Sequence, residues 1–320
     1  MRFFGTNQQN SSPEIRLGIA GQGDAGKTVL LRAIETILCD INPGPGLELA
    51  DLNAELAKKR YSELHEATEA FRTQGSVRTT TARDFRYAVV DGTKQVMTFV
   101  YHDAIGQLLQ QTELDDPDKK KHAEFVNKLS HADILWAVIP VRDVGGDIGI
   151  QMQEISIVKQ YIADAIRLRE ARSDASKVSV AVVLTKADVL GQGGFDEAKP
   201  TLAKLVNQIG DRFFNLIERS PSIWSGVVFP VSAFGFENST LQETSTDSQH
   251  HDEKRYLVDG DSLNPWNIDK LLLWSLASGL EQPRGRPKAD KLSNNIELTG
   301  RINGALALTG GPALVLKSPR

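Results

Sequence analysis

Residues 15–28 read IRLGIAGQGDAGKT, and this stretch decides the fold. Its first six residues form a short apolar run that stops at Gly21, and a helical pattern begins at Lys27. We therefore expect a strand, a tight glycine-rich loop and a helix, in that order. Residues 21–28 fit the pattern G-x-x-x-x-G-K-[ST] of a phosphate-binding loop at every position.

The residue types of this loop suit a polyphosphate. Glycines let the backbone curl so that successive N–H groups point at phosphate oxygens, and the following helix adds the positive end of its dipole. Lys27 would bridge the β- and γ-phosphates, and the Thr28 hydroxyl would bind Mg²⁺. The alternative is a glycine-rich turn that binds nothing, but the flanking strand and helix favour a binding loop. The candidate binding residues are Gly21, Gln22, Gly23, Asp24, Ala25, Gly26, Lys27, Thr28 and Val29.

Outside this loop, continuous apolar runs predict buried strands that alternate with helices. Two further apolar runs flank an Asp-Gly pair at residues 91–92, which indicates an antiparallel hairpin. The pattern predicts a three-layer α/β fold, with a mostly parallel sheet, one antiparallel edge strand and helices on both faces. The expected strands are 15–20, 85–90, 96–101, 133–141, 178–184 and 227–231, and the expected helices are 27–38, 48–73, 150–172, 199–218 and 267–278.

We expect one principal domain at residues 13–282, preceded by an extension at 1–12. Within it, a helical insertion is expected at about 40–76 and a polar loop insertion at about 237–262. Residues 283–320 carry seven Lys or Arg against two Asp or Glu and are expected to form a basic, disordered tail.

The composition limits the function classes. The chain has 320 residues and a formal net charge of −4, so there is no strong nucleic-acid signal. Its single cysteine, Cys39, cannot form an internal disulfide, and we expect a cytoplasmic protein. No apolar run approaches the roughly 18 residues that a transmembrane segment needs.

A second motif, TKAD at residues 185–188, follows the apolar run 178–184. The Asp188 carboxylate could accept hydrogen bonds from both N1–H and the exocyclic amine of guanine, whereas adenine offers no matching pair of donors. Lys186 would lay its stem along the plane of the base. So short a motif arises often by chance, but its position after the phosphate loop favours a base-binding role for Thr185, Lys186 and Asp188.

A third motif, DAIGQ at residues 103–107, ends the second hairpin strand. Asp103 would hold Mg²⁺, the Gly106 N–H would meet the γ-phosphate, and Gln107 would orient the attacking water. The alternative is an ordinary turn with an incidental glutamine, which we consider the weaker interpretation.

These three motifs, followed by Ser232-Ala233 after the run 227–231, occur in the order that the Ras-like GTPases of the translation-factor-related P-loop class show. The chain resembles that family over about residues 13–280. The resemblance implies GTP and GDP with Mg²⁺ as ligands, slow GTP hydrolysis, and two switch segments that contact an unidentified effector or regulator protein. It also implies that Ser232 and Ala233 bind the base, with the Ala233 N–H on guanine O6. Thr185 departs from the commoner Asn, and Phe234 stands where Lys is frequent. The bacterial double-GTPase proteins are a second, weaker resemblance.

The first switch is expected at residues 78–81, RTTT, just before the hairpin. One threonine would bind Mg²⁺ and the γ-phosphate; Thr79 and Thr81 both remain open, and we take Thr81 as the metal ligand. The resemblance extends to heterotrimeric G-protein α subunits, which keep an arginine finger three residues before that threonine. Arg78 is therefore a candidate catalytic residue beside Lys27 and Gln107, and the alternative is a solvated cation in a surface loop.

Two other functions fit the sequence less well. One is a scaffold of the same fold that binds GTP without useful turnover. The other is a P-loop ATPase or small-molecule kinase, against which the motif ending at Asp188 argues.

Overall fold

The computed structural model describes residues 14–23, 25–40, 47–51, 83–91, 94–103, 116–142, 148–172, 176–191, 194–236, 239–241, 256–258, 265–282 and 314–318. The strands are β1 (Glu14–Ala20), β2 (Leu47–Asp51), β3 (Arg83–Asp91), β4 (Lys94–Asp103), β5 (Ile134–Pro140), β6 (Val178–Thr185), β7 (Ile223–Pro230), β8 (Ser239–Leu241), β9 (Tyr256–Val258) and β10 (Leu314–Lys317). The helices are α1 (Lys27–Asp40), α3 (Asp116–Leu129), α4 (Ile148–Glu170), α5 (Phe195–Arg219) and α6 (Ile268–Glu281), with a 3₁₀ turn η2 (Ala187–Leu190).

Eight of these strands form one sheet in the order β10-β7-β6-β5-β1-β4-β3-β2. The five central strands, from β7 to β4, are mutually parallel. Antiparallel pairing occurs at both edges, between β10 and β7 on one side and among β2, β3 and β4 on the other. The expected α/β fold with a mostly parallel sheet is confirmed, but the expectation of a single antiparallel edge is wrong.

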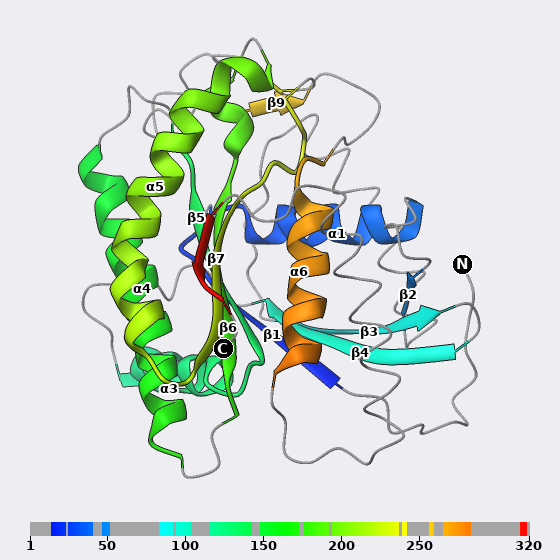
Figure 1. Ribbon diagram of the computed structural model, residues 1–320, viewed down its shortest axis with the longest axis vertical. Coiled ribbons are helices and arrows are strands. Elements are labelled where there is room, and N and C mark those ends of the chain that lie inside the picture. Colours follow the sequence, from blue (N-terminus) through cyan, green and yellow to red (C-terminus); the bar gives the residue numbers. More distant parts are fainter. Residues whose placement is uncertain are drawn as a thin grey trace.

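Helices cover both faces of the sheet, with α1 and α6 on one face and α3, α4 and α5 on the other (Figure 1). Successive residues of a strand point to opposite faces, so a strand in this position must be apolar throughout. On β5, Trp136 and Val138 enter the core beneath α1 and α6, while Leu135 and Ala137 enter the core beneath α3, α4 and α5. This double burial explains the continuous apolar runs that predict the strands.

The prediction of a helix at residues 48–73 is wrong for its first residues. Leu47–Asp51 is the strand β2, which pairs antiparallel with β3, and residues 52–82 lie outside the described residues. Leu49 and Leu52 follow a helical spacing, but main-chain pairing with β3 satisfies the backbone of this segment as a strand.

The expected disordered tail also contains a strand, β10, so that expectation is wrong for residues 314–317. Leu316 is buried in the core, and the Lys317 ammonium donates to the main-chain carbonyls of Ile217, Glu218 and Ser220. Within the expected polar insertion, β8 and β9 pair as a separate two-stranded ribbon. The part of the chain that the structure describes contains no helix long and apolar enough to cross a bilayer.

A buried hydrogen bond fixes α6 on the sheet. The Trp136 indole N–H donates to the Ser275 hydroxyl over 3.0 Å, and both residues are 0% exposed. We expect Ser275→Ala to lower the free energy of unfolding by about 1–3 kcal/mol, because a buried N–H donor loses its acceptor. Urea unfolding followed by circular dichroism measures this change.

Ser156→Ala on α4 is the matched control. Its exposed hydroxyl donates to the Met152 carbonyl four residues earlier, as the Ser275 hydroxyl donates to Leu271, but it accepts no bond from a buried donor. We expect this variant to stay within about 0.5 kcal/mol of the parent protein. Equal losses in the two variants would contradict the role assigned to the indole bond.

Candidate functional site

The candidate site lies at the carboxyl edge of the parallel strands. β1 lies between β4 and β5, so the chain changes side of β1 when it passes from β4 to β5. In open parallel sheets, ligands bind outside the carboxyl ends of the strands at such a reversal of strand order. Ala20, the last residue of β1, lies opposite Ala137, whereas the last residues of β5 and β6, Pro140 and Thr185, lie opposite each other. β5 and β6 thus extend three residues beyond β1, and the loop after β1 passes beside their ends, with Gly21 next to Val138 and Gly26 next to Thr185.

Loop 21–26 curls tightly between β1 and α1. Gly26 has φ +76°, a left-handed conformation that side chains other than hydrogen rarely tolerate. At Gly21, a Cβ atom would lie 2.8 Å from the Val138 main-chain oxygen, so the loop approaches β5 closely. The Leu30 N–H donates to the Gly26 carbonyl over 2.8 Å, which is the first helical hydrogen bond of α1. Gly21 and Gly26 thus occupy positions where a side chain would clash or be strained.

Lys27 places its charge inside this loop. It is 7% exposed, and its ammonium donates to the main-chain carbonyls of Gly21 and Gln22, each at 2.7 Å. Because a buried ammonium needs such partners, the side chain is held among the loop carbonyls. Positive charge and the amino end of α1 thus occur at the same place.

Thr185 braces the loop from the end of β6. Its buried hydroxyl donates to the Ala25 carbonyl over 2.6 Å, across 160 residues of sequence. This short hydrogen bond joins the first sequence motif to the second. Thr185, which departs from the commoner asparagine, still supplies a hydrogen-bond donor to the loop.

The rest of the second motif turns back beside the loop. Lys186 adopts a left-handed conformation, with φ 59°, and its Cε lies 4.0 Å from where a Cβ on Gly26 would be. Asp188 follows in η2 and is 6% exposed. The Ala187 N–H donates to the Val231 carbonyl over 3.1 Å, which ties this motif to the end of β7. Three of the four sequence motifs therefore meet.

The Ser232-Ala233 segment is held by contacts that the sequence did not predict. The Ser232 hydroxyl accepts the N–H groups of Phe234 and Gly235, at 3.2 and 2.8 Å. The Ser232 and Trp266 main chains exchange two hydrogen bonds, at 3.1 and 2.8 Å. The residue next to Trp266, Asn267, donates its side-chain amide to the Pro230 carbonyl over 2.8 Å. Residues 266–267, just before α6, thus brace this segment.

An aromatic cluster supports the same segment. Trp266 contacts Phe195 and Phe236 with ring centroids 5.0 and 5.1 Å apart, and the two phenylalanine rings lie 5.3 Å apart. Offset and edge-to-face pairs at such distances are stabilising. Trp266 is thus a packing residue, and its phenylalanine partners lie too far apart in sequence to be inferred.

Among the remaining predicted site residues, Asp103 lies in a described range. Asp103 is the last residue of β4, and it pairs with Arg83 one position beyond the pairing of His102 with Gly18 of β1. Its main chain therefore ends at the same edge as β1. The following predicted residues lie outside the described residues: Asp24, Arg78, Thr79, Thr81, Gly106 and Gln107.

The described ranges contain no group of three or more His, Cys, Asp or Glu residues placed to hold a metal ion. No protein-family model matches this sequence, and no curated protein matches it significantly. The site must therefore be interpreted from its own geometry.

The Thr185 bond can be tested without a ligand. We expect Thr185→Val to lower the free energy of unfolding by about 1–3 kcal/mol, because the buried Ala25 carbonyl loses its donor. We also expect faster amide hydrogen exchange in residues 25–28, which the bond holds in place. Urea unfolding and exchange followed by mass spectrometry measure both effects.

Thr185→Ser is the control, since it keeps the hydroxyl and removes only a methyl group. Its exchange in residues 25–28 should match that of the parent protein. If Thr185→Val also exchanges at the parental rate, the brace has no role in holding the loop.

Proposed function

We propose that the chain is a Ras-like P-loop GTPase that binds GTP and GDP with Mg²⁺ at loop 21–28. The observation that carries the proposal is the 2.6 Å hydrogen bond from Thr185 to Ala25, because it joins a phosphate-type loop to a guanine-type motif. Either motif alone is a short sequence match. Their contact across 160 residues is independent of the sequence patterns that suggested them.

The phosphate part of the proposal rests on the loop and on Lys27. The left-handed Gly26 and the close approach of Gly21 to β5 suit a loop whose N–H groups turn inward. The Lys27 ammonium, buried between two loop carbonyls, lies next to the amino end of α1. An entering anion would meet the ammonium and the helix dipole together, as phosphate sites at helix amino ends do.

The base part rests on Asp188 and the braced segment at 232–233. A nearly buried carboxylate selects a ligand that offers two adjacent N–H donors, which guanine has and adenine lacks. The Ala187–Val231 hydrogen bond joins the segment that carries Asp188 to the segment that precedes Ala233, whose N–H is the proposed donor to guanine O6. Lys186 would cover one face of the base with its stem.

The metal would be held by the Thr28 hydroxyl and, through water, by Asp103, with a switch threonine as a further ligand. Thr28 lies in the first turn of α1, and the β4 main chain ends at Asp103 on the same sheet edge. A bound Mg²⁺ would supply charge neutralisation for the β- and γ-phosphates. In our proposal Gln107 orients the attacking water, Arg78 is a candidate arginine finger, and the two switch segments contact an effector or regulator protein.

Base choice is the first test. We expect GTP to bind at least about 30-fold more tightly than ATP, since two unmet polar groups cost about 1–3 kcal/mol each. Lys27→Ala should strongly weaken the binding of both GTP and GDP. Asp188→Asn should weaken the binding of GTP and leave the affinity for ATP unchanged. Fluorescent nucleotide titration with and without Mg²⁺ measures these affinities.

Lys199→Ala, which removes an exposed lysine of α5, is the control for lost charge and should bind GTP normally. ATP bound as tightly as GTP would favour the ATPase or kinase alternative. If well-folded protein binds neither GTP nor ATP, the proposal is wrong.

Turnover separates a switch from a non-hydrolysing scaffold. We expect the parent protein to release phosphate from GTP slowly. In Gln107→Leu we expect the rate of hydrolysis to fall by about a further 100-fold, because the attacking water is no longer oriented. Single-turnover phosphate release measures both rates. In Arg78→Ala, a loss of about 10³-fold or more would identify an arginine finger, whereas an unchanged rate would assign Arg78 to the solvated surface.

A further inference from the structure

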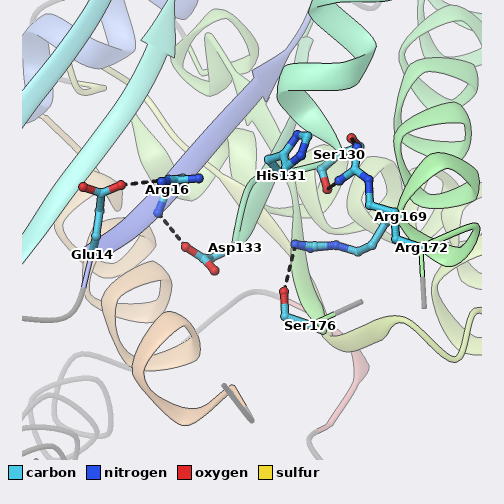
Figure 2. A pocket seen from close by; sticks show the side chains of 8 residues that line it. All are labelled: Glu14, Arg16, Ser130, His131, Asp133, Arg169, Arg172 and Ser176. Atoms are coloured by element: carbon cyan, nitrogen blue, oxygen red, sulfur yellow. Dashed lines mark hydrogen bonds and ion pairs between the residues drawn. The ribbon is translucent and has the colours of Figure 1, made fainter. Parts of the chain in front are cut away.

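A polar pocket lies at the amino edge of the parallel strands, opposite the candidate site. It has a volume of about 330 Å³ and is shown in Figure 2. The start of β1, the turn before β5, the carboxyl end of α4 and the start of β6 bring its side chains together. The lining residues are Glu14, Arg16, Ser130, His131, Asp133, Arg169, Arg172 and Ser176.

Two of its arginines, Arg169 and Arg172, form no ion pair with another described residue. Arg169 is 4% exposed, and its guanidinium donates to the Ala132 carbonyl at 2.7 and 3.1 Å and to the Ser176 hydroxyl at 3.5 Å. Arg172 donates to the Ser130 carbonyl and hydroxyl and to the Asn127 amide oxygen. All these acceptors are neutral, and no carboxylate of the described residues lies within ion-pair distance of either guanidinium.

The positive charges of Arg169 and Arg172 also repel each other. Burial lowers the pKa of Arg169; the charge of Asp133 acts to raise it, and the charge of Arg172 lowers it further. A buried charge is stabilised when an opposite charge and hydrogen bonds reach it together. The described chain supplies the hydrogen bonds, but its carboxylate, Asp133, acts on Arg169 without forming an ion pair.

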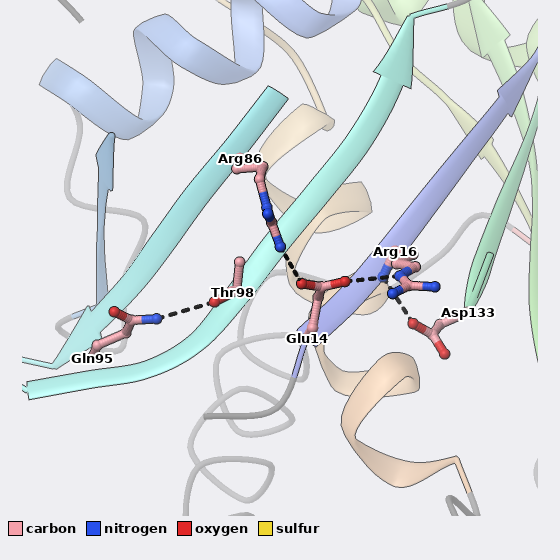
Figure 3. A network of polar contacts seen from close by, with 6 residues as sticks. All are labelled: Glu14, Arg16, Arg86, Gln95, Thr98 and Asp133. Carbon is pink, nitrogen blue, oxygen red and sulfur yellow. Dashed lines mark hydrogen bonds and ion pairs between the residues drawn. The ribbon is translucent and has the colours of Figure 1, made fainter. Parts of the chain in front are cut away.

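The acidic side chains of the pocket are already engaged with other groups, as Figure 3 shows. The Glu14 carboxylate lies between the guanidinium groups of Arg16 and Arg86, at 2.8 and 2.5 Å. Burial acts to raise the pKa of Glu14, but the hydrogen bonds and charges of these two arginines outweigh it and hold the pKa below its usual value. The Asp133 carboxylate accepts the Arg16 main-chain N–H at 2.8 Å. The three lining arginines, Arg16, Arg169 and Arg172, therefore exceed the two lining acids by one charge.

We propose that this pocket binds a phosphate group, either as inorganic phosphate or as the terminal group of a small phosphate monoester. Guanidinium groups offer several N–H donors in one plane, which suits the oxygens of a phosphate. The hydroxyls of Ser130 and Ser176 add neutral donors beside them. The volume exceeds that of one phosphate ion, so a short organic substituent also fits.

The arginines have a structural role as well. Their bonds to the Ala132 and Ser130 carbonyls hold the turn that follows α3, and both lie at or just beyond the end of α4. Cations at such positions offset the negative end of a helix dipole. That role accounts for part of their charge, and the phosphate accounts for the remainder.

Isothermal titration of inorganic phosphate into the full chain, at constant ionic strength, tests the proposal. We expect saturable binding with a dissociation constant on the order of 1 mM. Arg172→Gln should raise that constant at least about tenfold, since it removes one charged donor. A parallel titration with glycerol 3-phosphate distinguishes the two forms, because tighter binding of the ester identifies a monoester site.

Arg167→Gln is the matched control: it lies on the same helix, is exposed, pairs with Asp164 over 3.0 Å and does not line the pocket. Its phosphate affinity should stay within about twofold of the parent value. If Arg172→Gln fails to fold, Arg16→Gln replaces it, because that side chain is half exposed.

Lys27→Ala separates this pocket from loop 21–28, which could also take phosphate. Binding that survives Lys27→Ala and is lost in Arg172→Gln supports the pocket, whether or not the chain binds GTP. Binding that only Lys27→Ala removes, or no saturable binding, overturns the proposal and leaves the arginines as caps of the turn and helix ends.

Discussion

The hydrogen bond from the Thr185 hydroxyl to the Ala25 carbonyl is the contact on which the candidate site depends. It forms because β6 extends three residues beyond the end of β1, two strands away in the sheet, so that Thr185 reaches the loop that follows β1. Burial on both faces fixes this register, because a one-residue slip of any central strand would exchange its two buried sets of side chains. The loop geometry is thus a consequence of core packing about Trp136 and its neighbours.

The features that could be predicted from the sequence are local. A strand buried on both faces gives a continuous apolar run, so β1, β5, β6 and the second half of β7 could be located without the structure. The tight turn at loop 21–26 could be predicted because the glycines that it needs lie within a few residues of one another. The motif at 185–188 was also local, and only its contact with Ala25 needed the fold.

The features that could not be predicted depend on partners distant in the chain. β2 is a short edge strand whose leucines also fit a helix, and only β3 distinguishes the two conformations. β10 lies in a basic, glycine-containing segment, and its pairing with β7 decides its structure. The brace formed by Trp266 and Asn267 involves two main-chain bonds, which leave no trace in residue type.

The two edges of the sheet have opposite electrostatic character for one reason. A helix that follows a parallel strand begins at the carboxyl edge of the sheet and ends at the amino edge. The positive end of α1 therefore lies at loop 21–28, and the negative ends of α3 and α4 lie at the arginine pocket. The ends of α3 and α4 contribute about −0.5 charge each, or roughly −1 in total. Arg169 and Arg172 carry two positive charges, which is more than these helix ends neutralise. A capping role alone therefore leaves about one of their two positive charges to Asp133, whose carboxylate acts on Arg169 without forming an ion pair with it. Two guanidinium groups held only by neutral acceptors of the described residues distinguish this pocket from an ordinary helix cap.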